Sequence, residues 1–85
     1  MERKEIEQKV LAIVADHQGY EPDEVNITDR LDFNLECDSL DLIEIIMDCE
    51  REFGIYVPDE SIGGTDETVA SLCDRIEKII KEDEQ

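Results

Sequence analysis

Apolar side chains recur every three or four residues in three segments of this 85-residue chain, a spacing that places them on one face of an α-helix. The segments run from about Glu2 to Ala15, with the helix expected to stop near His17, from Ser39 to Phe53, and from Asp66 or Thr68 to Lys81. In the second segment, one apolar stripe is expected to face the core: Ile43, Ile46, Cys49 and Phe53. Gly19 and Gly54 stand where the first two helices are expected to end, and Asp38 stands at the expected N-cap of the second. No stretch alternates as a half-buried strand does, so the spacing predicts an all-α bundle.

The segments between these helices complete the expected fold. Residues 59–62, between Pro58 and the glycine pair 63–64, are expected to form one short helical turn. The connection from Tyr20 to Cys37 is expected to lie across the core, because it carries five spaced apolar residues: Val25, Ile27, Leu31, Phe33 and Leu35. The prediction is a single domain, residues 1–85, built as a four-helix bundle with three main helices and a short third one.

Charge and cysteine usage limit the partners and the compartment. The 25 acidic and 8 basic residues leave a net charge of −17, which repels nucleic acid and anionic membranes and attracts basic protein patches. No apolar run is long enough for a membrane span, and no apolar signal region follows the N-terminus. Three cysteines without CxxC spacing do not suit a secreted disulfide framework. A cytoplasmic monomer is therefore expected.

The most informative motif is Asp38-Ser39-Leu40-Asp41, at the start of an acidic amphipathic helix. A serine in the first helical turn faces free backbone N–H groups and the positive end of the helix dipole, which suits a phosphoester. No catalytic base lies near Ser39 in the sequence, because His17 is the only histidine and ends the first helix. Ser39 is therefore expected to accept a group from another enzyme rather than to act as a catalytic residue.

The chain resembles the acyl carrier protein family over nearly its whole length. The resemblance rests on Asp38-Ser39-Leu40, on Met47, and on the stretches Phe53-Gly54-Ile55, Val57-Pro58-Asp59-Glu60 and Thr68-Val69. It implies that Ser39 accepts 4′-phosphopantetheine from coenzyme A through a phosphopantetheinyl transferase. The arm's thiol would then carry acyl groups as thioesters to partner enzymes of fatty acid or related lipid and polyketide synthesis.

A docking surface for such partners is expected beside Ser39. Four carboxylates follow helical spacing from that position and form a negative stripe: Asp38, Asp41, Glu44 and Asp48. Leu40 and Met47 are expected to supply an apolar anchor on or near this face. Charge for steering and a small apolar contact suit brief encounters with several acyl-processing enzymes that carry basic patches.

Two departures from the family pattern bear on which pathway the chain serves. Glu36-Cys37 precedes the motif where the family has a small pair such as Gly-Ala, and residues 61–67 are about one residue longer than usual. These departures favour a dedicated carrier over the housekeeping one. Acidic neighbours are expected to raise the pKa of the Cys37 thiol, and Cys49 and Cys73 are expected in the core.

Other readings of the same residues stay open or fail. An aminoacyl or peptidyl carrier, and an unmodified acidic module that stabilises a basic partner, remain alternatives; a hydrolase lacks a visible base and oxyanion partner. His17 is expected to meet the C-terminal dipole of the first helix. No metal site is expected, because His17 and the cysteines lack zinc spacing and the run from Asp32 lacks the glycine and glutamate of a calcium loop.

Overall fold

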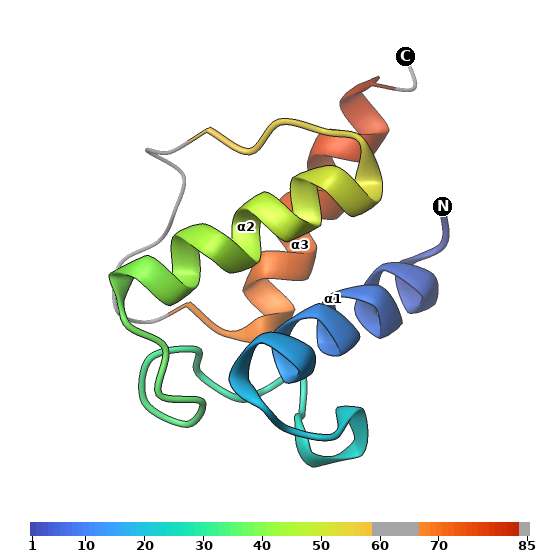
Figure 1. Cartoon of the computed structure of the whole chain (residues 1–85). Helices are drawn as coiled ribbons and strands as arrows, with labels where there is room; N and C mark the ends of the chain where they lie inside the picture. The colour runs from blue at the N-terminus through green and yellow to red at the C-terminus, as the bar shows by residue number, and fades with distance from the viewer. Residues whose placement is uncertain (59–66, 84–85) are drawn as a thin grey trace.

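The computed structural model describes residues 1–58 and 67–83, which contain three α-helices and one 3-10 turn. The elements are α1 (Arg3–Gln18), η1 (Pro22–Glu24), α2 (Ser39–Phe53) and α3 (Val69–Asp83) (Figure 1). The described ranges contain no strand, only an isolated antiparallel bridge between Arg30 and Thr68. The all-α prediction is confirmed. The short helix predicted at 59–62 lies outside the described residues, and the 3-10 turn at Pro22 was not predicted.

The predicted ends of α2 agree with the structure at both termini. Asp38 accepts a hydrogen bond from the Asp41 backbone N–H at 2.8 Å, and the Asp41 carboxylate accepts one from the Asp38 N–H at 3.1 Å. This reciprocal cap satisfies two N–H groups that a helix end otherwise leaves without partners. Gly54 ends the helix with φ of 65°, a left-handed conformation that only glycine adopts at little cost. Local chemistry therefore determines where Ser39 lies: the first residue of α2.

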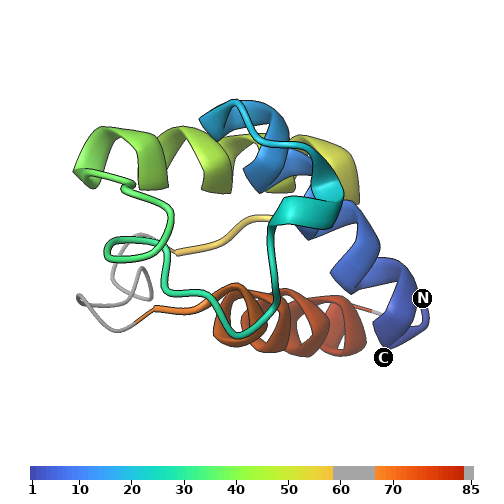
Figure 2. The same cartoon turned by 90° about the horizontal axis from the view of Figure 1, so that it is seen from below.

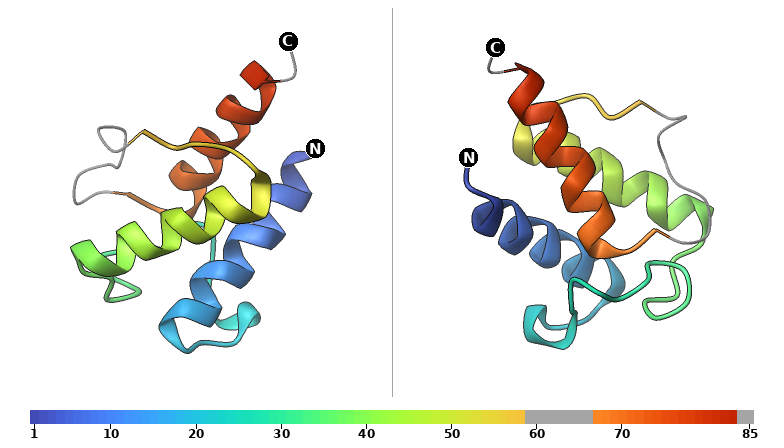
Figure 3. Two further views of the ribbon diagram at one scale, coloured as in Figure 1. Left: turned by 45° about the horizontal axis from the view of Figure 1, so that its top comes forward. Right: turned by 180° about the vertical axis from the view of Figure 1, so that it is seen from behind.

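The helices surround one aliphatic core. α1 packs against both α2 and α3 (Figures 1 and 3). The side chains that it buries come from one face and include Ile6, Val10 and Val14. Ile45 and Cys49 enter the core from α2, and the core takes these residues from α3: Val69, Leu72, Cys73 and Ile76. Cys49 and Cys73 are thus core residues, as predicted. No helix within residues 1–58 or 67–83 combines the length and apolarity that crossing a membrane requires.

The connection between α1 and α2 runs under the bundle and is tied to the start of α3 (Figure 2). The Leu31 N–H donates to the Glu67 carbonyl oxygen at 2.9 Å, and the Val69 N–H donates to the Asp29 carbonyl oxygen at 3.0 Å. Three of the five predicted apolar residues are buried, Val25, Leu31 and Leu35, and Ile27 packs partly against the core. The prediction that this connection lies across the core is confirmed for these four.

Two apolar residues predicted to face the core do not. Phe33 is 76% exposed; its backbone N–H donates to the Asp32 carboxylate, and the Arg30 guanidinium lies over its ring, 5.9 Å from the centroid. Ile43, expected on the buried stripe of α2, is 45% exposed. The apolar stripe of α2 is wider than the face that its neighbours cover, so Ile43 lies at its uncovered margin.

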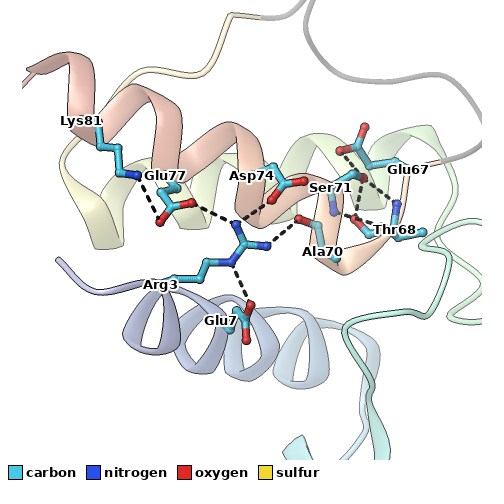
Figure 4. Close-up of polar contacts among 9 residues, drawn as sticks. All are labelled: Arg3, Glu7, Glu67, Thr68, Ala70, Ser71, Asp74, Glu77 and Lys81. Atoms are coloured by element: carbon cyan, nitrogen blue, oxygen red, sulfur yellow. Dashed lines mark hydrogen bonds and ion pairs between the residues drawn. The ribbon is translucent and has the colours of Figure 1, made fainter.

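Arg3 holds α1 against α3 through four polar contacts (Figure 4). Its guanidinium donates to Glu7 on its own helix at 2.8 Å and to Asp74 and Glu77 on α3 at 2.6 and 3.1 Å. A fourth bond reaches the Ala70 carbonyl oxygen at 3.3 Å. These carboxylates raise the pKa of Arg3, the Asp74 hydrogen bond most of all. In a chain with a net charge of −17, one cation thus neutralises repulsion between three carboxylates.

Replacing Arg3 by methionine is expected to lower the free energy of unfolding by about 1–2 kcal/mol, because a partly exposed network of charge-assisted hydrogen bonds is lost. Chemical denaturation at low salt measures this change. Lys4→Met is the matched control, since it removes the same charge from an exposed position of the same helix. An equal loss in both variants would show that net charge matters and the network does not.

Candidate functional site

Ser39 is exposed at the first position of α2. The first intrahelical bond is the one that Leu42 donates to the Asp38 carbonyl oxygen at 3.0 Å, so the N–H groups of Ser39 and Leu40 point out of the helix end. Within the described ranges, the Ser39 hydroxyl forms no hydrogen bond. An exposed hydroxyl at the positive end of a helix fits a phosphodiester, whose negative charge the dipole and the N–H groups stabilise.

Three apolar side chains of α2 lie exposed beyond Ser39. Leu40 is 63% exposed, Met47 is 53% exposed, and Ile43 stands between them in the sequence. Spacings of three and four residues place the three on one helix face. The structure confirms that Leu40 and Met47 are exposed and adds Ile43, which sequence reasoning assigned to the core. The sequence did contain a signal for the exposure of Ile43: it lies three residues after Leu40 and four before Met47, and therefore on the same helix face as these two predicted surface residues.

The four predicted docking carboxylates differ in how far hydrogen bonds and ion pairs within the chain already occupy their oxygens. Asp38 and Asp41 each commit a carboxylate oxygen to the cap of α2. Asp48 forms an ion pair with Arg51, one turn further along α2; the Asp48 side chain is partly exposed and the Arg51 side chain is exposed to solvent. Glu44 is half exposed, and among the described residues His17 is its one side-chain ion-pair or hydrogen-bond partner. The negative stripe exists, and Glu44 is its member best able to meet a partner's cation.

Glu36 and Cys37, which precede the motif, are held in an unusual turn. Glu36 has φ of 58°, in the left-handed region that favours glycine. The Cys37 N–H donates to the Leu31 carbonyl oxygen at 2.8 Å, which draws the thiol into the core. Burial raises the pKa of Cys37 to about 11, and Asp41 and Asp38 add to the shift. The thiol is therefore neutral and buried two residues before Ser39; its pKa is raised as predicted, with burial as the main cause and the acidic neighbours as the smaller one.

Glu36→Gly is expected to stabilise the fold by about 0.5–1 kcal/mol, since glycine adopts a positive φ without the clash of a Cβ. Thermal unfolding should show a rise of several degrees in Tm. Glu36→Gln, which keeps the Cβ and removes the charge, is the matched control. If Tm rises equally in the glutamine and glycine variants, charge repulsion at Glu36, and not strain of its backbone, is what destabilises the wild-type fold.

His17 lies in the last turn of α1, as predicted, but its ring reaches across to α2. The Nε2 atom is 3.4 Å from a Glu44 carboxylate oxygen, and Nδ1 is 2.7 Å from the side-chain oxygen of Gln18 and 4.0 Å from Asp41. The Gln18 contact raises the pKa of His17 most, and Glu44 and Asp41 raise it further. Sequence reasoning placed the ring at the helix dipole and missed its contacts with Asp41 and Glu44, because these residues are 24 and 27 positions from His17.

Comparisons with known proteins agree with this geometry. A family model described as "Phosphopantetheine attachment site" matches residues 8–76. The chain is 47% identical over 55 residues to an acyl carrier protein of Rickettsia bellii, covering 65% of this chain and 64% of that relative. It is also 47% identical over 60 residues to one of Rubrobacter xylanophilus, covering 71% and 74% of the two chains.

A solved structure agrees as well. The fold matches the acyl carrier protein from Enterococcus faecalis with a TM-score of 0.74 and 32% identity, over 93% of this chain and 99% of that one. The phosphopantetheine model spans Ser39 and the whole of α2. By sequence and by fold, this chain belongs to the acyl carrier protein family, whose members carry acyl groups on phosphopantetheine.

Proposed function

We propose that this chain, acting as one domain over residues 1–85, carries acyl groups as thioesters on a 4′-phosphopantetheine arm attached to Ser39. The observation that carries the assignment of Ser39 is its exposed, unbonded hydroxyl at the first turn of α2. The helix end supplies outward N–H groups and the positive dipole, which favour a phosphodiester there. Membership of the family supports the same residue, because Ser39 lies in the Asp-Ser-Leu motif.

Attachment joins the Ser39 Oγ to the phosphate that bears pantetheine, breaks the pyrophosphate bond of coenzyme A and releases adenosine 3′,5′-bisphosphate. The hydroxyl proton leaves to a base, which the transferase supplies. His17, the one histidine of the chain, contacts Gln18 and Glu44 rather than Ser39. This arrangement supports a carrier that adds no catalytic group of its own and depends on a phosphopantetheinyl transferase.

Partner enzymes are proposed to dock on the exposed face of α2 beside Ser39. The docking surface consists of Asp38, Leu40, Asp41, Ile43, Glu44, Met47 and Asp48. Its carboxylates steer a basic patch toward the arm, and its three apolar side chains give a contact small enough to release quickly. The tether keeps the cargo at a high effective concentration near each active site.

Acyl cargo is favoured over aminoacyl cargo, because the relatives matched by this chain are acyl carrier proteins. Fatty acid synthesis or related lipid and polyketide chemistry is the proposed setting. The three cysteines are all free thiols in the structure, which fits the reducing cytoplasm as the place of action.

Fragmentation mass spectrometry tests the site directly. The chain is incubated with coenzyme A, Mg²⁺ and a broad-specificity transferase, digested, and the added phosphopantetheine is located on its peptide. We expect the group on Ser39. A group on Ser61, Ser71 or a threonine, or no addition to a folded protein with an active transferase, would contradict the proposal. Loading with acyl and aminoacyl ligases then separates the two cargo classes.

A further inference from the structure

His17, Asp41 and Glu44 converge at the junction of α1 with the start of α2. One ligand atom from each, a ring nitrogen and two carboxylate oxygens, lies within 4.8 Å of the other two. The three come from two helices and differ in chemistry, so this is more than a run of acidic residues along one surface. His17 is largely covered, with 18% of its side chain exposed.

The hydrogen bonds of Gln18 determine which ring nitrogen of His17 carries its proton. The Gln18 amide nitrogen donates to the Leu35 carbonyl oxygen at 2.9 Å, and this oxygen can only accept. The Gln18 side-chain oxygen therefore faces Nδ1 of His17 at 2.7 Å and accepts its hydrogen. In the neutral imidazole the hydrogen is then on Nδ1, and Nε2 presents a lone pair.

That lone pair faces a carboxylate. Nε2 is 3.4 Å from a Glu44 oxygen, which is also an acceptor, so the two atoms attract each other only when a proton on Nε2 or a metal ion lies between them. Asp41 adds a second oxygen beside the ring, because its Oδ2 accepts in the cap and its Oδ1 lies 4.0 Å from Nδ1 of His17 and is left without a cap bond. The cluster therefore consists of three electron-pair donors with a combined charge of −2.

We propose that His17, Asp41 and Glu44 bind a divalent transition-metal ion of the Zn²⁺ class through Nε2 and the two carboxylates. An imidazole with two carboxylates suits Zn²⁺, whereas Mg²⁺ and Ca²⁺ prefer oxygen ligands alone. The Gln18 oxygen fixes the ring through its other nitrogen, as the second shell of a metal-bound histidine does. Coordination at Nε2 requires a rotation of the half-exposed Glu44 and a small shift of the Asp41 Oδ1 along the ring, and water completes the coordination.

Binding would remove two carboxylates from the docking surface beside Ser39 and join α1 to α2. This consequence for docking rests on the proposed function, whereas the binding itself does not. Binding is therefore measured on the chain with Ser39 unmodified, so that neither the arm's thiol nor any partner enzyme takes part.

Calorimetric titration with Zn²⁺ tests the site, and His17→Gln and Glu44→Gln are each expected to weaken binding by about tenfold or more. Asp16→Asn is the matched control: it removes an exposed carboxylate one residue from His17, and its affinity should stay within about twofold of wild type. Circular dichroism verifies that each variant folds. Binding by His17→Gln within about twofold of wild type would overturn the proposal.

Nitrogen NMR gives a second readout, because His17 is the only histidine in the chain. Zn²⁺ should move the Nε2 resonance and leave Nδ1 in its protonated form. Mg²⁺ in about tenfold excess should not reverse the change, since it competes poorly for imidazole. An unmoved Nε2, or displacement of zinc by that excess of Mg²⁺, would mean that the acidic surface attracts cations without a site, and the proposal would be wrong.

Discussion

Ser39→Ala is expected to abolish addition of phosphopantetheine completely, while the wild-type chain gains one arm per molecule. The alanine variant lacks the only atom to which the phosphate can be joined at this place. It should fold normally, because the Ser39 side chain is exposed and the cap of α2 comes from Asp38 and Asp41. Intact mass after incubation with coenzyme A, Mg²⁺ and a transferase measures the result.

Thr28→Ala is the matched control, because it removes another exposed hydroxyl from the connection that precedes α2. We expect this variant to be loaded as fully as the wild type. Loading of Ser39→Ala would move the attachment site elsewhere. Equal failure of the wild type, with the protein folded, would instead support the unmodified interaction module and direct attention to the strained turn at Glu36.

The second large effect is expected from the apolar part of the docking surface. Truncating Leu40 and Met47 together to alanine should lower kcat/KM for transfer to or from a partner enzyme by about 10–100-fold. Both side chains are more than half exposed, so the loss should appear in docking and not in the free energy of unfolding. Steady-state kinetics with the loaded carrier as the varied substrate measure the effect, and thermal unfolding verifies the fold.

Tyr56→Ala serves as the comparison for that double variant. Tyr56 is 69% exposed and follows the C-terminal end of α2, so its removal takes away exposed apolar area outside the docking surface. Its kcat/KM should remain close to that of the wild type. A similar fall in kcat/KM for both variants would indicate that partners respond to exposed apolar area in general, and the proposed docking surface would be wrong.

The local sequence determined the helices and the position of Ser39. Helical spacing, the Asp38 cap and the glycine stop predicted α2 at both ends, and α1 and α3 within a few residues. These features are decided by contacts between residues up to four positions apart, which a sequence displays directly. For the same reason the exposed Leu40 and Met47 could be predicted, since their spacing from Ser39 along one helix determines their face.

Tertiary packing decided the rest. A hydrophobic stripe does not state how much of it a neighbouring helix covers, so Ile43 was assigned to the core and lies at the surface. The exposure of Phe33 likewise depends on how the connection meets the bundle, because Leu31 and Leu35 on either side of it in the sequence are buried. The convergence of His17 with Glu44 required α1 and α2 to cross at one place. Residue spacing within one helix cannot predict this contact, because His17 and Glu44 belong to different helices and come together only when the two helices pack.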